Sequence, residues 1–502
     1  MNINRISPKI IDSLRKPITH LSNPSNLLPV ILLETTVTGG RSIQAYKRGG
    51  KTEFRERFTE DAVSAVFWLG GATALNKFGD KIGEKFLNIP ANFDGGSDAL
   101  RTPIKNTAKA MLEKAEQAIT PENLRQTEKK LARFKFTKIA LSTLISTAFV
   151  GFVLPKINQA LTRRAIMRDN AKQSKQQISV TGQSTVPAAL NSSSKLNQPS
   201  FKGVNPTKLA NLAHNLENHA IFKLASSDAG ILTGRTMNAR NADERREVLF
   251  RDITSSYFYT INPIVTRKIL THVVPNGKLA TINSDTSQSV LKEFSRVVSE
   301  HGGSISADKF SEVLLGTMDD SKKAIMDSLP FKDGVISLDV LKKVIKDSDI
   351  IERATKMTGL QPEHADLGKV LTQKQVEDVL RNGAITDFKS MFNMHKAQFG
   401  DALTNPSKFV SMNKVNNFRD AISTFVDETV KCAKDGQITE DVLKTVDKKN
   451  LLRNGAFWAV GFLISALFLS TLIPKAQYWL TERRTGKNEF PGLHDKKLNQ
   501  KV

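Results

Sequence analysis

The two most apolar stretches of the chain, residues 139–154 and 456–473, contain no ionisable side chain. They are 16 and 18 residues long, and a helix needs about 17 to 25 mostly apolar residues to cross a bilayer. Apolar residues occupy every helical face of the second run, whereas a surface helix of a soluble domain keeps a polar face. The pattern predicts two membrane-spanning helices. The alternative is that both runs are buried central helices of a helical bundle.

Other segments have the ordinary pattern of amphipathic helices. In residues 289–298 and 375–383 the apolar positions recur at helical spacing, with polar residues between them. These segments, together with the two apolar runs, predict an all-α fold.

The two apolar runs have matching sequences at their ends, "LPKINQALTRR" and "IPKAQYWLTERR". A shift of 319 positions aligns residues 119–164 with residues 438–483 without a gap, and 15 of the 46 aligned positions are identical. Such self-similarity is typical of an internal repeat. The aligned residues include Pro155 and Pro474, Lys156 and Lys475, and Arg164 and Arg483.

A second match lies upstream, where a shift of 191 positions aligns residues 53–68 with residues 244–259. Shorter matches join "TGGRSIQA" at 38–45 with "LTGRTMNA" at 232–239, and "DALRTPIK" at 98–105 with "DALTNPSK" at 401–408. The matches follow the same order in both halves, which indicates two homologous modules. Identical residues in the longer match include Arg55 and Arg246, Asp61 and Asp252, and Phe67 and Phe258.

The repeat divides the chain into segments. A polar stretch rich in Ser, Gln and Asn separates the modules and is typical of a flexible linker. The second module is longer than the first, which places a helical insertion inside it. The predicted segments are an N-terminal segment (1–37), module one (38–165), the linker (166–205), the start of module two (206–271), the insertion (272–398), the end of module two (399–484) and a C-terminal tail (485–502).

Each module also has a weaker uncharged segment, residues 62–76 in the first and 253–266 in the second. Two membrane crossings per module, or none, would keep the two copies in equivalent surroundings. We therefore expect each weak segment to form a hairpin with the strong apolar run of its module. In that hairpin Asp61 would pair with Arg164, and Asp252 with Arg483. Lys and Arg flank both sides of the strong runs, so the positive-inside rule does not fix the orientation.

The composition narrows the choice of partners. The chain has 73 Lys and Arg against 50 Asp and Glu, a net charge of +23, which favours anionic lipid headgroups or nucleic acid. A nucleic-acid binder would need a continuous basic patch with stacking aromatic residues, but here basic residues flank apolar runs. We therefore expect lipid headgroups, contacted by Lys156 and Lys475, and not nucleic acid. The basic N-terminal stretch lacks the apolar core of a cleaved signal peptide.

Three motifs resemble known ligand-binding motifs but lack features that such sites require. The stretch "AYKRGGKT" (45–52) resembles a phosphate loop but does not follow a buried strand. Turns at Gly303, Gly334 and Gly436 resemble the centre of a calcium-binding loop, but the positions that should carry oxygen ligands are mostly occupied by other residue types. They are better interpreted as helix N-caps at Ser306, Ser337 and Thr439.

A third cluster, "HNLENH", places His214 and His219 five residues apart, so that they lie on different helix faces and cannot share a metal. The single Cys432 excludes a disulfide framework and a zinc site with several cysteines. We therefore expect neither an enzyme nor a cofactor.

The leading interpretation is an integral membrane protein with a structural or interaction role, which presents the insertion to a protein partner. Two alternatives stay open. The first is a pseudo-symmetric transporter or pore, which should carry ionisable residues within its spans. The second is a basic peripheral membrane or nucleic-acid-binding protein.

Overall fold

The computed structural model describes residues 8–23, 26–91, 93–97, 102–175, 206–218, 220–358, 370–403, 405 and 408–494. The described chain is mostly helical, which confirms the all-α prediction. The N-terminal half contains α1 (Pro8–Ser22), α2 (Leu28–Val66), η2 (Phe67–Gly71), α3 (Ala72–Leu87), α4 (Pro103–Lys114), α5 (Pro121–Ala148), η3 (Phe149–Val153) and α6 (Leu154–Lys175). The C-terminal half opens with α7 (Pro206–Asn218), α8 (Ala220–Met237), α9 (Ala242–Ser256), η4 (Tyr257–Ile261), α10 (Asn262–Val273) and η5 (Gly277–Thr281), and closes with α19 (Glu440–Leu467), η8 (Phe468–Leu472), α20 (Ile473–Thr485) and η9 (Pro491–His494).

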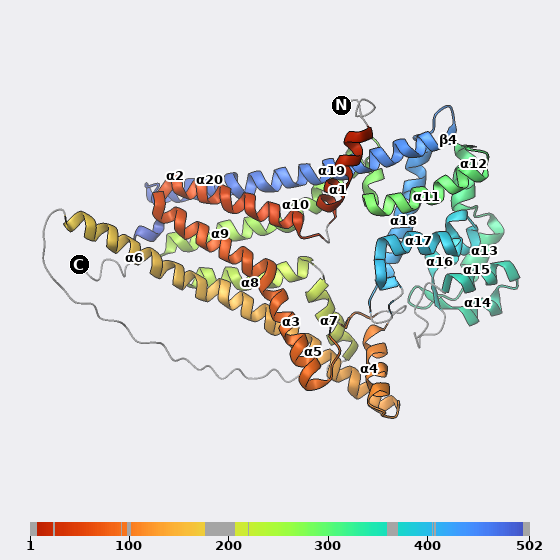
Figure 1. Cartoon of the computed structure of the whole chain (residues 1–502), viewed down its shortest axis with the longest axis horizontal. Coiled ribbons are helices and arrows are strands. Elements are labelled where there is room, and N and C mark those ends of the chain that lie inside the picture. The colour runs from red at the N-terminus through yellow and green to blue at the C-terminus, as the bar shows by residue number, and fades with distance from the viewer. Residues whose placement is uncertain are drawn as a thin grey trace.

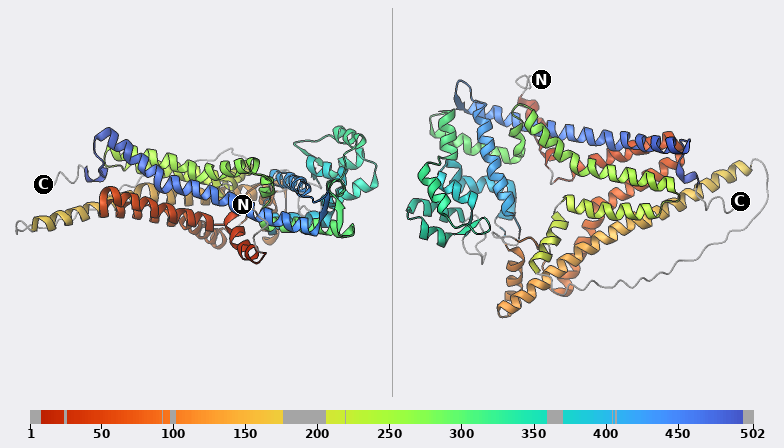
Figure 2. Two further views of the ribbon diagram at one scale, coloured as in Figure 1. Left: turned by 90° about the horizontal axis from the view of Figure 1, so that it is seen from above. Right: turned by 180° about the vertical axis from the view of Figure 1, so that it is seen from behind.

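Long helices from both halves form one bundle, and a smaller helical domain lies at one end of it (Figures 1 and 2). Helices α5 and α6 run away from that domain, and so do α19 and α20 (Figure 1). Helix α2 bends back at Gly49 and Gly50, where the backbone leaves the helical conformation. The basic turn "AYKRGGKT" is therefore a reversal between two helical arms, residues 28–48 and 51–66.

Each half contributes an arm that packs on the other half. The first arm of α2 contacts η8, and α8 contacts η3. Both contacts are so close that only a residue without a side chain fits. A Cβ atom at Gly40 would lie 2.3 Å from the Cβ of Ser470, and one at Gly234 would lie 2.5 Å from the carbonyl carbon of Gly151. The two halves thus interlock.

The apolar runs continue as helices through their prolines, because a wider π-helical turn precedes each one. These turns are η3 before Pro155 and η8 before Pro474. Proline lacks an N–H group and clashes with the preceding turn, which leaves carbonyl groups without intrahelical partners. The other half supplies donors: Arg41 Nε binds the carbonyl of Leu469 at 3.0 Å, and Asn238 Nδ2 binds that of Gly151 at 3.3 Å.

The smaller domain contains two antiparallel pairs of short strands between helices. Strand β1 (Ser304–Ser306) pairs with β4 (Gln437–Thr439), and β2 (Val335–Ser337) pairs with β3 (Val370–Thr372). Its helical elements are α11 (Ser284–Glu300), α12 (Ala307–Leu315), α13 (Asp320–Ser328), α14 (Leu338–Val344), α15 (Ser348–Thr358), α16 (Gln373–Arg381), η6 (Ala384–Thr386), α17 (Phe388–Phe399), η7 (Gly400–Leu403) and α18 (Met412–Val430).

The predicted N-caps in this domain are partly correct. Ser306 and Ser337 accept hydrogen bonds from the backbone N–H groups of Lys309 and Val340, which confirms two of them. Thr439 makes no such bond, so the third prediction is wrong. Thr372, which was not among the predicted caps, also forms one, with a reciprocal capping box to Gln375.

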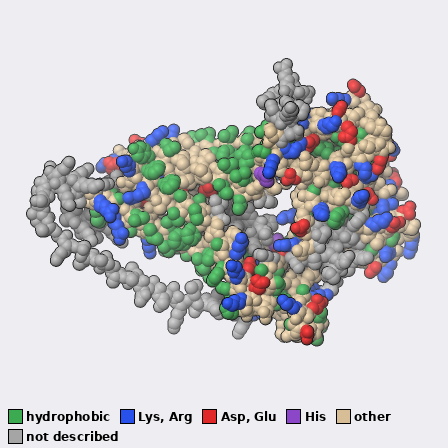
Figure 3. All heavy atoms as spheres, viewed as in Figure 1, with side chains coloured by type: hydrophobic (Ala, Val, Ile, Leu, Met, Phe, Trp, Pro, Cys, Tyr) green, Lys and Arg blue, Asp and Glu red, His purple; other side chains and the backbone are tan. Residues whose placement is uncertain are grey.

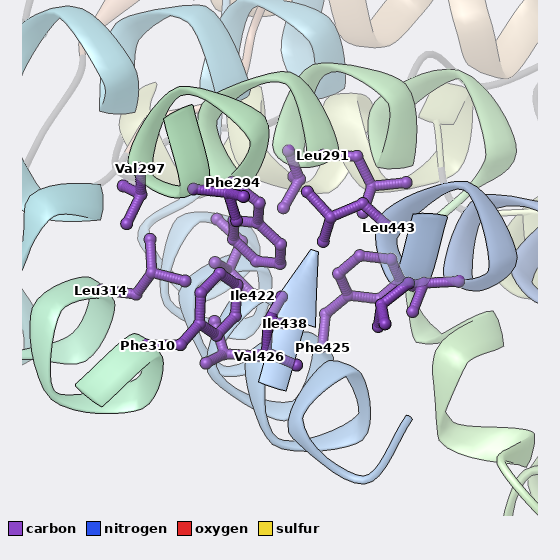
Figure 4. Packing of buried hydrophobic residues seen from close by; sticks show 14 of the residues in the cluster. Leu291, Phe294, Val297, Phe310, Leu314, Ile422, Phe425, Val426, Ile438 and Leu443 are labelled. Atoms are coloured by element: carbon purple, nitrogen blue, oxygen red, sulfur yellow. The ribbon is translucent and has the colours of Figure 1, made fainter. Parts of the chain in front are cut away.

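The core of the domain is a cluster of buried aromatic and aliphatic side chains (Figure 4). Phe294 and Phe310 come from α11 and α12, whereas Phe425 comes from α18 and Val442 from the first turns of α19. The core therefore extends beyond residue 398, the predicted end of the insertion.

The bundle exposes many apolar side chains, which cover much of its visible surface in Figure 3. Leu144 and Leu463, aligned in the two apolar runs, are 56% and 63% exposed. Among the described residues, two helices are long and apolar enough to cross a membrane, Pro121–Arg168 and Glu440–Thr485. Only 33% of the residues in the most apolar window of each are buried, whereas a core helix of a soluble protein is mostly buried.

Candidate functional site

A cavity of about 440 Å³ lies between the two halves, inside the bundle. We call it the axial pocket. Its polar side chains come from corresponding segments of both halves, and aliphatic side chains form the rest of its wall. The charged and hydroxyl-bearing residues that line it are Glu34, Arg41, Asp61, Ser64, Arg235, Asp252, Ser255, Ser256, Tyr259 and Thr260.

Two arginines cross from one half to the other at this pocket. Arg41 donates to Ser255 Oγ at 2.6 Å, and Arg235 donates to Ser64 Oγ at 2.9 Å. Arg41 and Arg235 occupy matching positions of "TGGRSIQA" and "LTGRTMNA", and Ser64 and Ser255 are aligned by the shift of 191. The two contacts are thus equivalent: in each, the arginine of one half donates to the aligned serine of the other half.

The same arginines also face an aspartate of their own half. Arg235 lies 3.3 Å from Asp252, and Arg41 lies 3.8 Å from Asp61. The pairs are unequal, because Asp252 has a second partner in Arg251 at 2.7 Å. Oxygen Oδ2 of Asp61 is buried and has no hydrogen-bond partner.

Glu60 and Arg251 close the network behind the pocket. Their side chains form an ion pair of 3.0 Å and are 12% and 2% exposed. Glu60 also contacts Arg57 at 2.8 Å and Arg235 at 3.2 Å. One carboxylate therefore joins three guanidinium groups from both halves.

A second set of crossed ion pairs lies near the bend of α2. Arg48 pairs with Glu247 at 2.8 Å, and Arg240 pairs with Glu56 at 2.6 Å. Glu56 and Glu247 are aligned in the two halves. The aligned pair Asn158 and Gln477 bonds to the same two residues: Asn158 Nδ2 donates to the carbonyl of Glu56, and Gln477 Nε2 to the carboxylate of Glu247, at 2.7 and 2.8 Å.

Most of the predicted site residues fall into four groups. Phe67 stacks on Phe149 with ring centres 4.1 Å apart, and Phe258 stacks on Phe468 at 4.2 Å. Pro155 and Pro474 are the second residues of α6 and α20. Both aspartates line the axial pocket. Lys156, Lys475, Arg164, Arg246 and Arg483 are exposed.

The ion pair expected between Asp61 and Arg164 is wrong, because Asp61 faces Arg41 and Arg164 points outward. The corresponding pair of Asp252 with Arg483 is also wrong, since Asp252 binds Arg235 and Arg251. Arg483 instead stacks on Trp479. The predicted hairpin overlooked the first arm of each half, which carries the true partners.

Arg55 and Arg246 lie near the ends of the apolar helices. Arg55 donates to the carbonyl of Leu161 at 3.2 Å, and Arg246 lines a cavity of about 400 Å³ beside Leu480. Leu161 and Leu480 are aligned by the shift of 319. The sequence therefore placed these two arginines at the correct end of the bundle without identifying their contacts.

Arg41, Arg235, Ser64 and Ser255 were missed as functional residues. All four lie in matched segments, and this could have marked them as candidates. The pairing of Arg41 with Ser255, however, depends on the exchange of arms between the halves. That exchange depends on which helices pack together, which a comparison of the two modules does not reveal.

The described residues contain no group of three or more His, Cys, Asp and Glu side chains placed to hold a metal ion. His214 instead bonds Asp94 at 2.6 Å. Burial acts to raise the pKa of Asp94, but hydrogen bonds from His214, Gly96 and Phe409 outweigh it and lower that pKa below its usual value. His219 lies outside the described residues.

Comparisons with protein-family models, curated proteins and solved structures gave no match to this chain. The function is therefore argued from the bundle, the axial pocket and the smaller domain.

Proposed function

We propose that this chain is an integral membrane protein with a structural or interaction role, built from two homologous modules that carry a helical docking domain at one end. The exposed apolar surface of the bundle is the observation that carries the proposal. Leu144, Leu463 and their neighbours would face lipid, because a large exposed apolar surface is unfavourable in water. Exposed Lys156 and Lys475 would contact anionic headgroups.

The proposed duplication is supported by repeated geometry. The π-helical turns η3 and η8 begin at Phe149 and Phe468, which are aligned by the shift of 319. Each of these phenylalanines stacks on an aligned phenylalanine of its own half, and the arginine contacts at the axial pocket repeat in reverse. Independent segments would not be expected to share all three features.

The docking role of the smaller domain is supported by its place and its surface. It lies at one end of the bundle, and its visible surface is rich in charged side chains (Figures 1 and 3). Its four short strands pair two by two, as the strands of paired calcium-binding loops do, yet the turns at Gly303, Gly334 and Gly436 lack most of the oxygen ligands. We therefore propose that the domain binds a protein partner without calcium.

Cell fractionation tests the membrane proposal. The chain should stay with membranes after washes at high salt and at high pH, and should require detergent for release. Leu463→Lys places a charge on the exposed apolar surface and should reduce insertion, since a charge at the centre of a span costs about 3 kcal/mol. Val344→Lys, at an exposed apolar residue of the smaller domain, is the matched control and should leave insertion unchanged.

Recovery of the chain in the soluble fraction without detergent would contradict the proposal. Salt-sensitive release from membranes, or salt-sensitive retention on DNA or RNA, would instead support the peripheral alternatives.

A pseudo-symmetric transporter is the second candidate function, and the axial pocket favours it. Ionisable residues inside a membrane bundle are costly and typically mark a transport path. Here Asp61 and Asp252 lie at a cavity between equivalent helices, as sites between repeats do in transporters. Flux of a bound solute in reconstituted vesicles, lost in Asp61→Asn, would support transport over anchoring.

A further inference from the structure

Asp61 has an unmet capacity for a hydrogen bond. Its carboxylate is 9% exposed, and Oδ2 accepts no hydrogen bond. Its closest cation, Arg41, lies 3.8 Å away, whereas the aligned Asp252 has guanidinium nitrogens at 2.7 and 3.3 Å. A buried acceptor without a donor costs about 1 to 3 kcal/mol, and more when it is charged. A ligand that donates to Asp61 would recover this energy.

The charge of the pocket favours a cation. Three carboxylates line it, Glu34, Asp61 and Asp252, against two guanidinium groups, Arg41 and Arg235. Both guanidinium groups already bind groups of the protein. Arg41 donates to the carbonyl of Leu469 and to Ser255, and Arg235 donates to Asp252 and to Ser64. The Nε of Arg235 makes no hydrogen bond but lies 3.2 Å from the carboxylate of Glu60. An anionic ligand would have to compete with these contacts, whereas an ammonium group could use Asp61 directly.

The rest of the wall is apolar. The aliphatic side chains that line it are those of Val37, Ala65, Ile231, Leu232, Ile253 and Ile261. A volume of about 440 Å³ falls within the range of small-molecule sites, which are mostly apolar with a few placed polar groups. The ligand that fits both the carboxylate and this wall carries one positive charge and a short hydrocarbon part.

We propose that the axial pocket binds a small organic cation, with its ammonium group at Asp61 and its hydrocarbon part against the aliphatic wall. The inference uses the bundle fold and the burial of Asp61, and it requires neither transport nor a membrane. Asp252 and Glu34 contribute negative charge, and Arg41 and Arg235 hold the two halves in register around the ligand.

Binding of n-butylammonium to the purified full-length chain tests this site. Two control probes have a similar size: butyrate, which is negatively charged, and 1-butanol, which is uncharged. Calorimetry should show saturable binding of butylammonium, and affinity should fall at least tenfold in Asp61→Asn. Ala65→Leu, which fills the pocket without changing charge, should also weaken binding. Asp80→Asn removes a buried carboxylate paired with Lys138 outside the pocket and should leave the affinity unchanged.

Tighter binding of butyrate than of butylammonium would overturn the proposal, because the arginines would then define the ligand. Equal binding of 1-butanol, or an unchanged affinity in both Asp61→Asn and Ala65→Leu, would overturn it as well. Thermal unfolding of each variant shows whether a loss of binding reflects a loss of folding. Binding is measured on purified protein, so its result does not depend on the fractionation experiment. Recovery of the chain in the soluble fraction would refute the membrane proposal without refuting this site, and an absence of binding would refute this site without refuting the membrane proposal.

Discussion

Glu60 and Arg251 occupy aligned positions in the two halves, and their side chains meet next to the axial pocket. If both positions carried the same residue, two like charges would be buried side by side, which is strongly unfavourable. Opposite charges at this point allow the halves to pack closely. The difference between the aligned segments is therefore as informative as their similarity.

Removal of either charge from this pair should destabilise the bundle. Glu60→Gln leaves three guanidinium groups without their shared carboxylate, and breaking a buried pair of this kind costs about 3 to 5 kcal/mol. Chemical unfolding of Glu60→Gln, Arg251→Gln and the double variant gives the coupling energy, which we expect to be 1 kcal/mol or more. The exposed pair Lys309 and Glu312 is the control and should couple by less than about 1 kcal/mol. A coupling near zero for Glu60 and Arg251 would show that their contact does not join the halves.

His395 makes the smaller domain sensitive to acid. Its ring is buried beside Phe399 and Phe418, and its Nδ1 lies 2.8 Å from the carbonyl of Met391. Burial, with a further contribution from the charge of Arg419, lowers the pKa of His395 to about 3. Because an unfolded histidine has a pKa of about 6.5, the unfolded state binds the proton first as the pH falls.

Stability of this domain should therefore fall from about pH 6.5 towards pH 3, by up to about 1.4 kcal/mol per pH unit, and should be fully retained above pH 6.5. His395→Phe keeps an aromatic ring in the site and should flatten that slope. His301→Gln, at an exposed histidine, should not. Hydrogen exchange of core amides between pH 4.5 and 7 measures the effect, and an unchanged slope in His395→Phe would assign the acid sensitivity to other groups.

At the scale of elements, the hydrophobic pattern and the local sequence predicted those features that are determined by residues close together in the chain. The apolar helices and the caps at Ser306 and Ser337 follow from such patterns. Strand β3 did not, because Val370–Thr372 is only three residues long and all three are buried, which gives no alternation to detect. The exchange of arms at Gly40 and Gly234 also escaped prediction, since it depends on contacts between distant segments.

The end of the insertion shows the same limit and leads to a prediction. A fragment with the predicted bounds of the insertion, residues 272–398, lacks α18 and the start of α19, which supply Phe418, Phe425 and Val442 to the core. We expect that fragment to aggregate or to remain loosely packed. A fragment of residues 272–449 should give dispersed amide spectra and cooperative unfolding. Phe425→Ala in the longer fragment should cost about 3 to 5 kcal/mol. Cooperative folding of the shorter fragment would show that α18 is dispensable.

For the whole molecule, the direction of the helices determines which ends would lie on which side of a membrane if the bundle spans one. Helices α5 and α8 contact each other, with Gly230 against Thr147 and Gly234 against Gly151, so they run in the same direction. Helix α6 thus ends at one end of the bundle, whereas α7 begins at the other, packed on Leu131 and Ala132. If the bundle spans a bilayer along its axis, the end of α6 and the start of α7 therefore lie on opposite sides of it.

Cysteine labelling tests this consequence. In a Cys432→Ser background, Arg164→Cys and Lys208→Cys place single thiols at exposed positions beyond opposite ends of the apolar run. A spanning bundle predicts that a membrane-impermeant maleimide labels the two from opposite sides of a sealed vesicle. Labelling from the same side would contradict a spanning bundle with this helix arrangement, and the exposed apolar surface would then have to be covered by protein instead of lipid.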